Sequence, residues 1–178
     1  TIGYTLLLVY GTLFPLSGWQ SPASNPFALM LQRGLQNTSR ADILTNLLVY
    51  LPFGLLLLRT LAKRRGTTYS VLVVTLASAL LSLALEYSQA HLPGRVPSIM
   101  DVLLNTAGGF SGALLAIGIR SDSALGARLY RLRSTYIHPG PLANLGLFTL
   151  SMWILSQLSP LVPSIDLGNL RHGLKPLW

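Results

Sequence analysis

Cysteine is absent from this chain, and acidic residues are scarce, with five among 178 positions. The lack of cysteine excludes a disulfide framework and any metal or redox site built on thiolates. Charged residues of both signs make up 10% of the chain, whereas soluble domains carry about 25%. Because so few charges cannot solvate a protein surface, the composition argues against a soluble globular protein.

Long apolar runs take the place of charge, and hydrophobic residues make up 51% of the chain. Several runs approach the ~20 residues that a helix needs to cross a bilayer. The runs are solid rather than alternating, which disfavours a membrane β-barrel. We therefore expect an all-α, polytopic membrane protein. Its five predicted spans cover about residues 2–19, 43–59, 69–90, 102–119 and 143–161.

The distribution of basic residues predicts how the chain is oriented in the plasma (inner) membrane. Eight of the thirteen Lys and Arg residues lie between spans two and three or between spans four and five. Because loops rich in basic residues stay in the cytoplasm, we expect these two connections and the amino terminus to be cytoplasmic. The net charge of +8 then indicates contact with anionic lipid rather than nucleic acid.

Two of the predicted spans begin with the same pattern, Ser-x-x-Asp-x-x-x-Asn, which starts at Ser39 and at Ser98. Serine followed three residues later by an acid is typical of a helix cap. Capping does not explain the asparagines, which lie one turn deeper on the same helix face and cannot be satisfied by lipid. The matched spacing also predicts a parallel repeat of two helical hairpins. The acids and amides of the two patterns are Asp42, Asn46, Asp101 and Asn105.

Glu86 is an acid inside an apolar run, in the stretch "LALEYSQAHLPGR". A charge at the centre of a membrane helix costs ~2.5–3.5 kcal/mol on insertion scales, so such a residue needs a partner. Gln89 lies on the same helix face, and Arg95 follows in the next loop. The sequence therefore predicts one extracytoplasmic cluster, formed by Asp42, Asn46, Glu86, Gln89, Arg95, Asp101 and Asn105.

Four interpretations of this cluster remain open. An ion-paired network would hold the helices together, with arginines neutralising the acids. A binding or accessory protein would hold a membrane lipid or a lipid-linked glycan or peptide of the envelope. In an enzyme, Glu86 or Asp101 would act as general base and Arg95 would stabilise negative charge. A transporter would use Glu86 as a proton relay. The sequence specifies neither a cofactor, nor a metal site, nor an oligomeric state.

These residues give the chain a resemblance to the VanZ-like family, small membrane proteins named for a member linked to teicoplanin resistance. The matching stretches are "VYGTLFP", "DILTNLLVYLPFG" and "LALEYSQAHLPGRVPSIMDVLLNTAGGFSG". The resemblance covers roughly residues 1–120 and implies a four-helix membrane domain and a cell-envelope context, without implying a reaction. We expect residues 121–141 to be a basic cytoplasmic linker, and residues 142–178 to hold the fifth span and an extracytoplasmic tail.

Overall fold

The computed structural model describes residues 1–22, 24–32, 39–62, 66–120, 123–137 and 139–158. Within these ranges the chain forms seven helices, and every regular element is helical. The chain divides into two compact units, Thr1–Tyr136 and Ile137–Trp178. The expected all-α fold class is confirmed.

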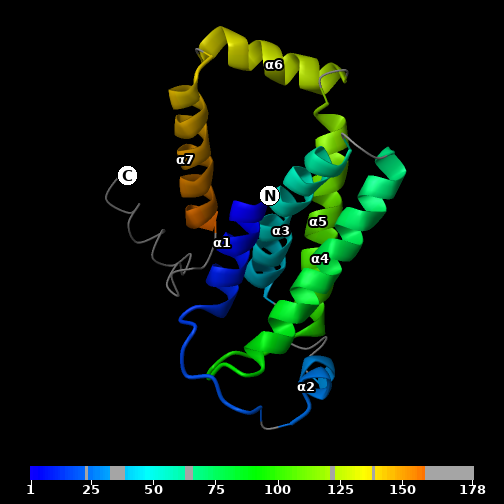
Figure 1. Ribbon diagram of the computed structural model, residues 1–178, viewed down its shortest axis with the longest axis vertical. Coiled ribbons are helices and arrows are strands. Elements are labelled where there is room, and N and C mark those ends of the chain that lie inside the picture. The colour runs from blue at the N-terminus through cyan, green and yellow to red at the C-terminus, as the bar shows by residue number, and fades with distance from the viewer. Residues whose placement is uncertain (23, 33–38, 63–65, 121–122, 138, 159–178) are drawn as a thin grey trace, which may run out of the picture. The chain divides into compact units, whose positions relative to one another are not determined.

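The first unit contains the helices that position the predicted cluster. They are α1 (Ile2–Leu13), α2 (Pro26–Gln32), α3 (Arg40–Leu61), α4 (Thr67–Gln89), α5 (Ile99–Gly118) and α6 (Ala124–Tyr136). Three of them, α3, α4 and α5, are long and apolar enough to cross a membrane. Helix α5 packs against both α3 and α4, and α1 packs against the same two helices (Figure 1).

The first helix is shorter than the sequence predicts, because α1 ends at Leu13 rather than near Trp19. Phe14 precedes Pro15, and a residue before proline is disfavoured in the α-conformation. The backbone of Phe14 is accordingly extended, with ψ at 135°. The 12 residues of α1 rise ~18 Å, less than the ~30 Å of a bilayer core, so the predicted extent of this span is wrong.

Helix α4 turns small polar side chains toward the bundle and large apolar ones away from it. Ser78 and Ser82 are fully buried, whereas Leu76 and Leu80 are 61% and 57% exposed. The hydroxyl of Ser78 donates to the carbonyl oxygen of Val74 at 2.8 Å, which satisfies it within its own helix. This distribution suits a helix whose outer face meets lipid, since lipid leaves no reason to bury leucine.

Glycines let α3 and α5 approach each other at backbone distance. A Cβ on Gly108 would collide with the carbonyl oxygen of Leu47, and a Cβ on Gly112 would collide with that of Leu51. The later glycine of α5 thus meets the later leucine of α3, so the two helices run parallel. The small-x-x-x-small spacing of Gly108 and Gly112 thus permits close packing of the two helices.

The remaining predicted segments are described in part. Helix α7 (Pro141–Leu158) lies in the second unit and occupies most of the predicted fifth span. The "KRR" turn at 63–65 and the predicted tail after 158 fall outside the described residues. Helix α2 was not predicted. It packs beside the last turn of α4, where the rings of Phe27 and Tyr87 are 5.6 Å apart.

Candidate functional site

Three acidic residues meet at the end of the bundle where α3 and α5 begin and α4 ends. We call this the acidic end and define it by Asp42, Glu86 and Asp101. Glu86 Oε2 accepts a hydrogen bond from the backbone N–H of Ser98 at 2.9 Å, which joins the end of α4 to the start of α5. The carboxyl group of Asp101 lies within electrostatic range of both Asp42 and Glu86.

The start of α3 is a complete capping box. Ser39 Oγ accepts from the backbone N–H of Asp42 at 3.1 Å, and Asp42 Oδ2 accepts from the backbone N–H of Ser39 at 3.0 Å. The Ser39 hydroxyl also lies 2.7 Å from Asp42 Oδ2. The capping interpretation of this pattern is therefore confirmed at Ser39. One oxygen of Asp42 is committed to holding the helix start.

The start of α5 carries the same residues but a different set of hydrogen bonds. Ser98 Oγ accepts from the backbone N–H of Met100 at 3.2 Å. The backbone N–H of Ser98, which an acid at the third helical position would receive in a capping box, is taken by Glu86 instead. Ser98 thus caps α5, as the pattern predicts, whereas Asp101 does not return a hydrogen bond to the Ser98 N–H.

The carboxyl group of Asp101 lies beside an amide. Its side chain interacts with that of Asn46, which lies one helical turn beyond Asp42 on α3. Both side chains are half-buried. An acid and an amide side by side present several acceptors and two donors, a combination that hydrogen-bonds sugar hydroxyls and peptide groups equally well.

Beneath Glu86 lies a buried polar group formed by Asn105, Ser82 and Tyr50. Asn105 Nδ2 donates to Ser82 Oγ at 2.9 Å. Asn105 Oδ1 has no hydrogen-bond partner in the described structure, and neither does the hydroxyl of Tyr50. The side chain of Ser82 lies beside that hydroxyl without meeting hydrogen-bond geometry, and Glu86 lies within electrostatic range of it. Since unpartnered buried polar atoms each cost about 1–3 kcal/mol, both atoms are available to hydrogen-bond a ligand or an ordered water.

Gln89 and Arg95 hold the end of α1. Gln89 Nε2 donates to the carbonyl oxygen of Thr12, and Arg95 Nη2 donates to that of Phe14, both at 3.2 Å. The last carbonyl groups of a helix have no partner within it, so these two side chains complete the early end of α1. Arg95 also interacts electrostatically with Glu86, in addition to its hydrogen bond to Phe14.

The seven residues of the predicted cluster differ in solvent exposure. Asp42 and Arg95 are exposed, Asn46, Gln89 and Asp101 are half-buried, and Glu86 and Asn105 are 4% and 7% exposed. The described residues contain no group of three or more His, Cys, Asp or Glu side chains that could hold a metal ion. The side chains of the arrangement can offer a ligand hydrogen bonds and carboxyl groups.

The VanZ/LLP1 family model matches residues 1–120, which include all of these side chains. The chain belongs to the VanZ/LLP1 family. No curated protein and no solved structure matches the chain. The sequence resemblance to VanZ-like proteins is thus confirmed, and this VanZ/LLP1 protein is a helical membrane protein by its three apolar helices.

Two buried members of the candidate site, Tyr50 and Ser82, were not predicted from the sequence. Tyr50 is 2% exposed and continues the spacing of Asp42 and Asn46, because each follows the previous one by four residues on α3. Ser82 lies one turn before Glu86 on α4, but its bond to Asn105 could not be foreseen. The four-residue spacing was the signal available for Tyr50.

Proposed function

We propose that the acidic end binds the polar head group of a lipid-linked glycan or peptide of the cell envelope, on the extracytoplasmic side of the membrane. The observation that carries the proposal is the pair of buried polar atoms without partners, Asn105 Oδ1 and the Tyr50 hydroxyl, next to Glu86. A purely structural network would be expected to satisfy its own polar atoms, because each unpaired one lowers stability.

The chemistry of the exposed part supports the same proposal. Asp101 and Asn46 offer acceptors and donors at half-buried positions, and Arg95 donates a hydrogen bond to the carbonyl oxygen of Phe14. Carboxylates in excess of basic groups disfavour a bare phosphate and favour groups rich in donors, such as sugar hydroxyls and peptide N–H groups. The expected orientation, with basic loops in the cytoplasm, directs this end outward.

The test uses the full chain purified in a neutral detergent. An isoprenoid-linked disaccharide peptide is added, and the shift in unfolding temperature is compared with that caused by phosphatidylcholine. Glu86→Gln should fold with an unfolding temperature close to that of wild type, because glutamine keeps an oxygen for the Ser98 N–H. It should lose most of the stabilisation by the isoprenoid-linked probe, because an amide NH2 replaces the second carboxyl oxygen.

The matched control is Tyr87→Phe, one residue along α4 on its exposed face. It keeps the aromatic ring beside Phe27 and should respond to the probe as wild type does. Equal stabilisation of wild type and Glu86→Gln would reject the proposal. Mass spectrometry of the same mixtures tests the enzymatic alternative, which requires loss of intact probe with wild type but not with Glu86→Gln.

The structural alternative makes a distinct prediction. If Glu86 and Arg95 form a buried pair that only holds the fold, removing one partner costs about 3–5 kcal/mol. Each single change, Glu86→Gln or Arg95→Gln, would then lower the unfolding temperature, and the double change would restore it together with any envelope phenotype, such as glycopeptide sensitivity. We expect instead that Glu86→Gln stays stable, and that the double change restores no function.

A further inference from the structure

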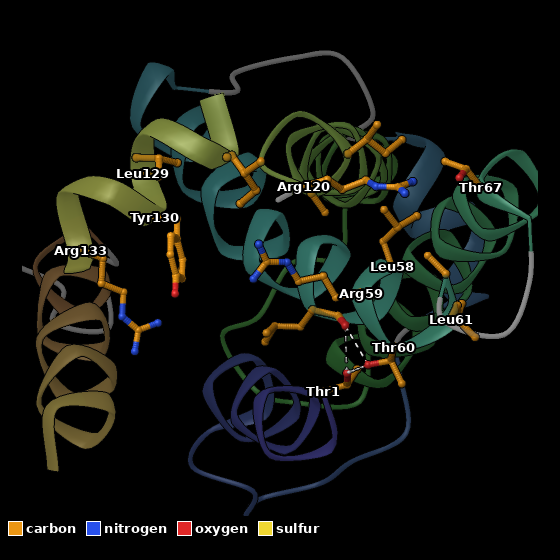
Figure 2. A pocket seen from close by; sticks show the side chains of 16 residues that line it. Thr1, Leu58, Arg59, Thr60, Leu61, Thr67, Arg120, Leu129, Tyr130 and Arg133 are labelled. Carbon is orange, nitrogen blue, oxygen red and sulfur yellow. Dashed lines mark hydrogen bonds between the residues drawn. The ribbon is translucent and has the colours of Figure 1, made fainter. Parts of the chain in front are cut away.

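A large hollow lies at the end of the first unit opposite the acidic end. Its volume is about 1390 Å³, and it is open on one side. The residues around it come from the start of α1, the last turns of α3 and α5, and α6 (Figure 2). None of the proposed binding residues lies here, so the hollow is a separate feature of the molecule.

Three arginines, Arg59, Arg120 and Arg133, line this space, which we call the arginine hollow. None of its described lining residues is acidic. Arg59, Arg133 and the hydroxyl of Tyr130 reach toward the same open space in Figure 2. In a chain with so few charges, the guanidinium groups of Arg59 and Arg133, which reach toward one space, create a field that attracts an anion.

The position of α6 brings Arg133 to the hollow. Ser123 Oγ lies 2.6 Å from the carbonyl oxygens of both Gly118 and Arg120, and it accepts from the backbone N–H of Gly126 at 2.9 Å. A Cβ on Gly126 would collide with the carbonyl oxygen of Arg120, so α6 begins in direct contact with the end of α5. This tight connection turns the Gly126, Tyr130 and Arg133 side of α6 toward the bundle.

The neighbouring face of α6 is apolar and uncovered. Leu125, Leu129 and Leu132 recur at helical spacing and are 48%, 45% and 47% exposed. A helix with basic side chains beside such a stripe is typical of one that lies in the membrane interface. The hollow therefore opens where lipid acyl chains and head groups are both available.

We propose that the arginine hollow binds the phosphate-bearing head group of an anionic phospholipid, whose acyl chains lie along the leucines of α6. Guanidinium groups match phosphate oxygens with paired hydrogen bonds. Arg59 and Arg120 also face the carbonyl ends of α3 and α5, where a cation stabilises a helix. Arg133 comes from a third helix and adds charge beyond what those two helix ends require.

The test measures lipid retained by the full chain in neutral detergent, by native mass spectrometry, during titration with phosphatidylglycerol or phosphatidylcholine. Wild type should retain phosphatidylglycerol preferentially. Arg59→Gln with Arg133→Gln should weaken this binding by about twentyfold, since a basic residue near an anionic lipid surface contributes roughly fivefold. The matched control is Arg128→Gln with Arg131→Gln, which removes the same charge from exposed positions of α6 outside the hollow.

An equal loss in both double variants would overturn the proposal, because it would show attraction by net charge alone. Full displacement of phosphatidylglycerol by millimolar inorganic phosphate would overturn the lipid assignment in favour of a free anion. Unfolding temperatures without added lipid show whether each variant folds. If the Arg59 and Arg133 double variant does not fold, Arg133→Gln alone, which lies outside the four packed helices, should lower affinity about fivefold. No change in that single variant would then reject the proposal.

Discussion

The helix starts at Ser39 and at Ser98 share serine, aspartate and asparagine at the same spacing, yet their aspartates have different hydrogen-bond partners. At α3 the aspartate closes its own capping box. At α5 the acceptor for the Ser98 N–H is Glu86 of α4, and Asp101 interacts with Asn46 instead. One acid placed on a neighbouring helix thus changes a second acid from a capping residue into a candidate binding residue.

The largest expected effect comes from forcing α5 away from α3. Gly112→Leu places a side chain where the carbonyl oxygen of Leu51 already lies, so α5 must move away from α3. We expect a loss of about 3 kcal/mol or more in the free energy of unfolding in detergent. Gly118→Leu is the control on the same helix, because a Cβ there meets nothing within 4 Å. Similar losses in both variants would contradict the close packing of α3 and α5.

A smaller effect is expected from removing the acceptor that Glu86 lends to α5. Glu86→Ala leaves the part-buried N–H of Ser98 without its partner, at a cost of about 1–3 kcal/mol in the free energy of unfolding. Glu86→Gln should recover most of this loss, since its amide oxygen can accept the same bond. The two variants are compared by thermal or denaturant unfolding. Equal destabilisation in both would show that charge, not the hydrogen bond, holds this helix start.

The smallest effects separate the two aspartates by stability. Asp42→Ala removes the acceptor for the Ser39 N–H and should cost about 1 kcal/mol in the free energy of unfolding. Asp101→Ala removes no capping bond and relieves the neighbouring charge of Asp42, so its cost should stay within about 0.5 kcal/mol. The same unfolding assay measures both. A larger loss for Asp101→Ala than for Asp42→Ala would contradict the different roles of the two helix starts.

Helical spacing and hydropathy predicted the three long helices α3, α4 and α5 of the first unit, because long apolar runs and the four-residue interval both report on one helix at a time. They did not predict features that depend on contacts between helices. The early end of α1 at Leu13 could have been read from Pro15, yet the capture of its last carbonyl groups by Gln89 and Arg95 could not. The sequence predicts that these two residues lie in one extracytoplasmic cluster with the acids, but their hydrogen bonds to α1 depend on how the helices pack.

The same limit explains the candidate site. The sequence identified Glu86 by its charge in an apolar run, and it identified Asp101 and Asn105 by a repeated pattern. It gave both aspartates the same capping role, because a pattern within one helix cannot show that Glu86 of α4 reaches the Ser98 N–H. The sequence analysis did not identify Tyr50, whose hydroxyl is one of the two buried atoms left without a hydrogen bond among the described residues.

The most direct test of the proposed binding role compares the two aspartates in the presence of a ligand. The shift in unfolding temperature caused by the isoprenoid-linked disaccharide peptide is measured for wild type, Asp42→Asn and Asp101→Asn, each as the folded full chain. We predict that wild type and Asp42→Asn are stabilised alike, and that Asp101→Asn loses most of the shift. Equal loss in both variants, equal retention in both, or no shift in wild type would contradict the claim that the acidic end binds such a head group through the acid that capping leaves free.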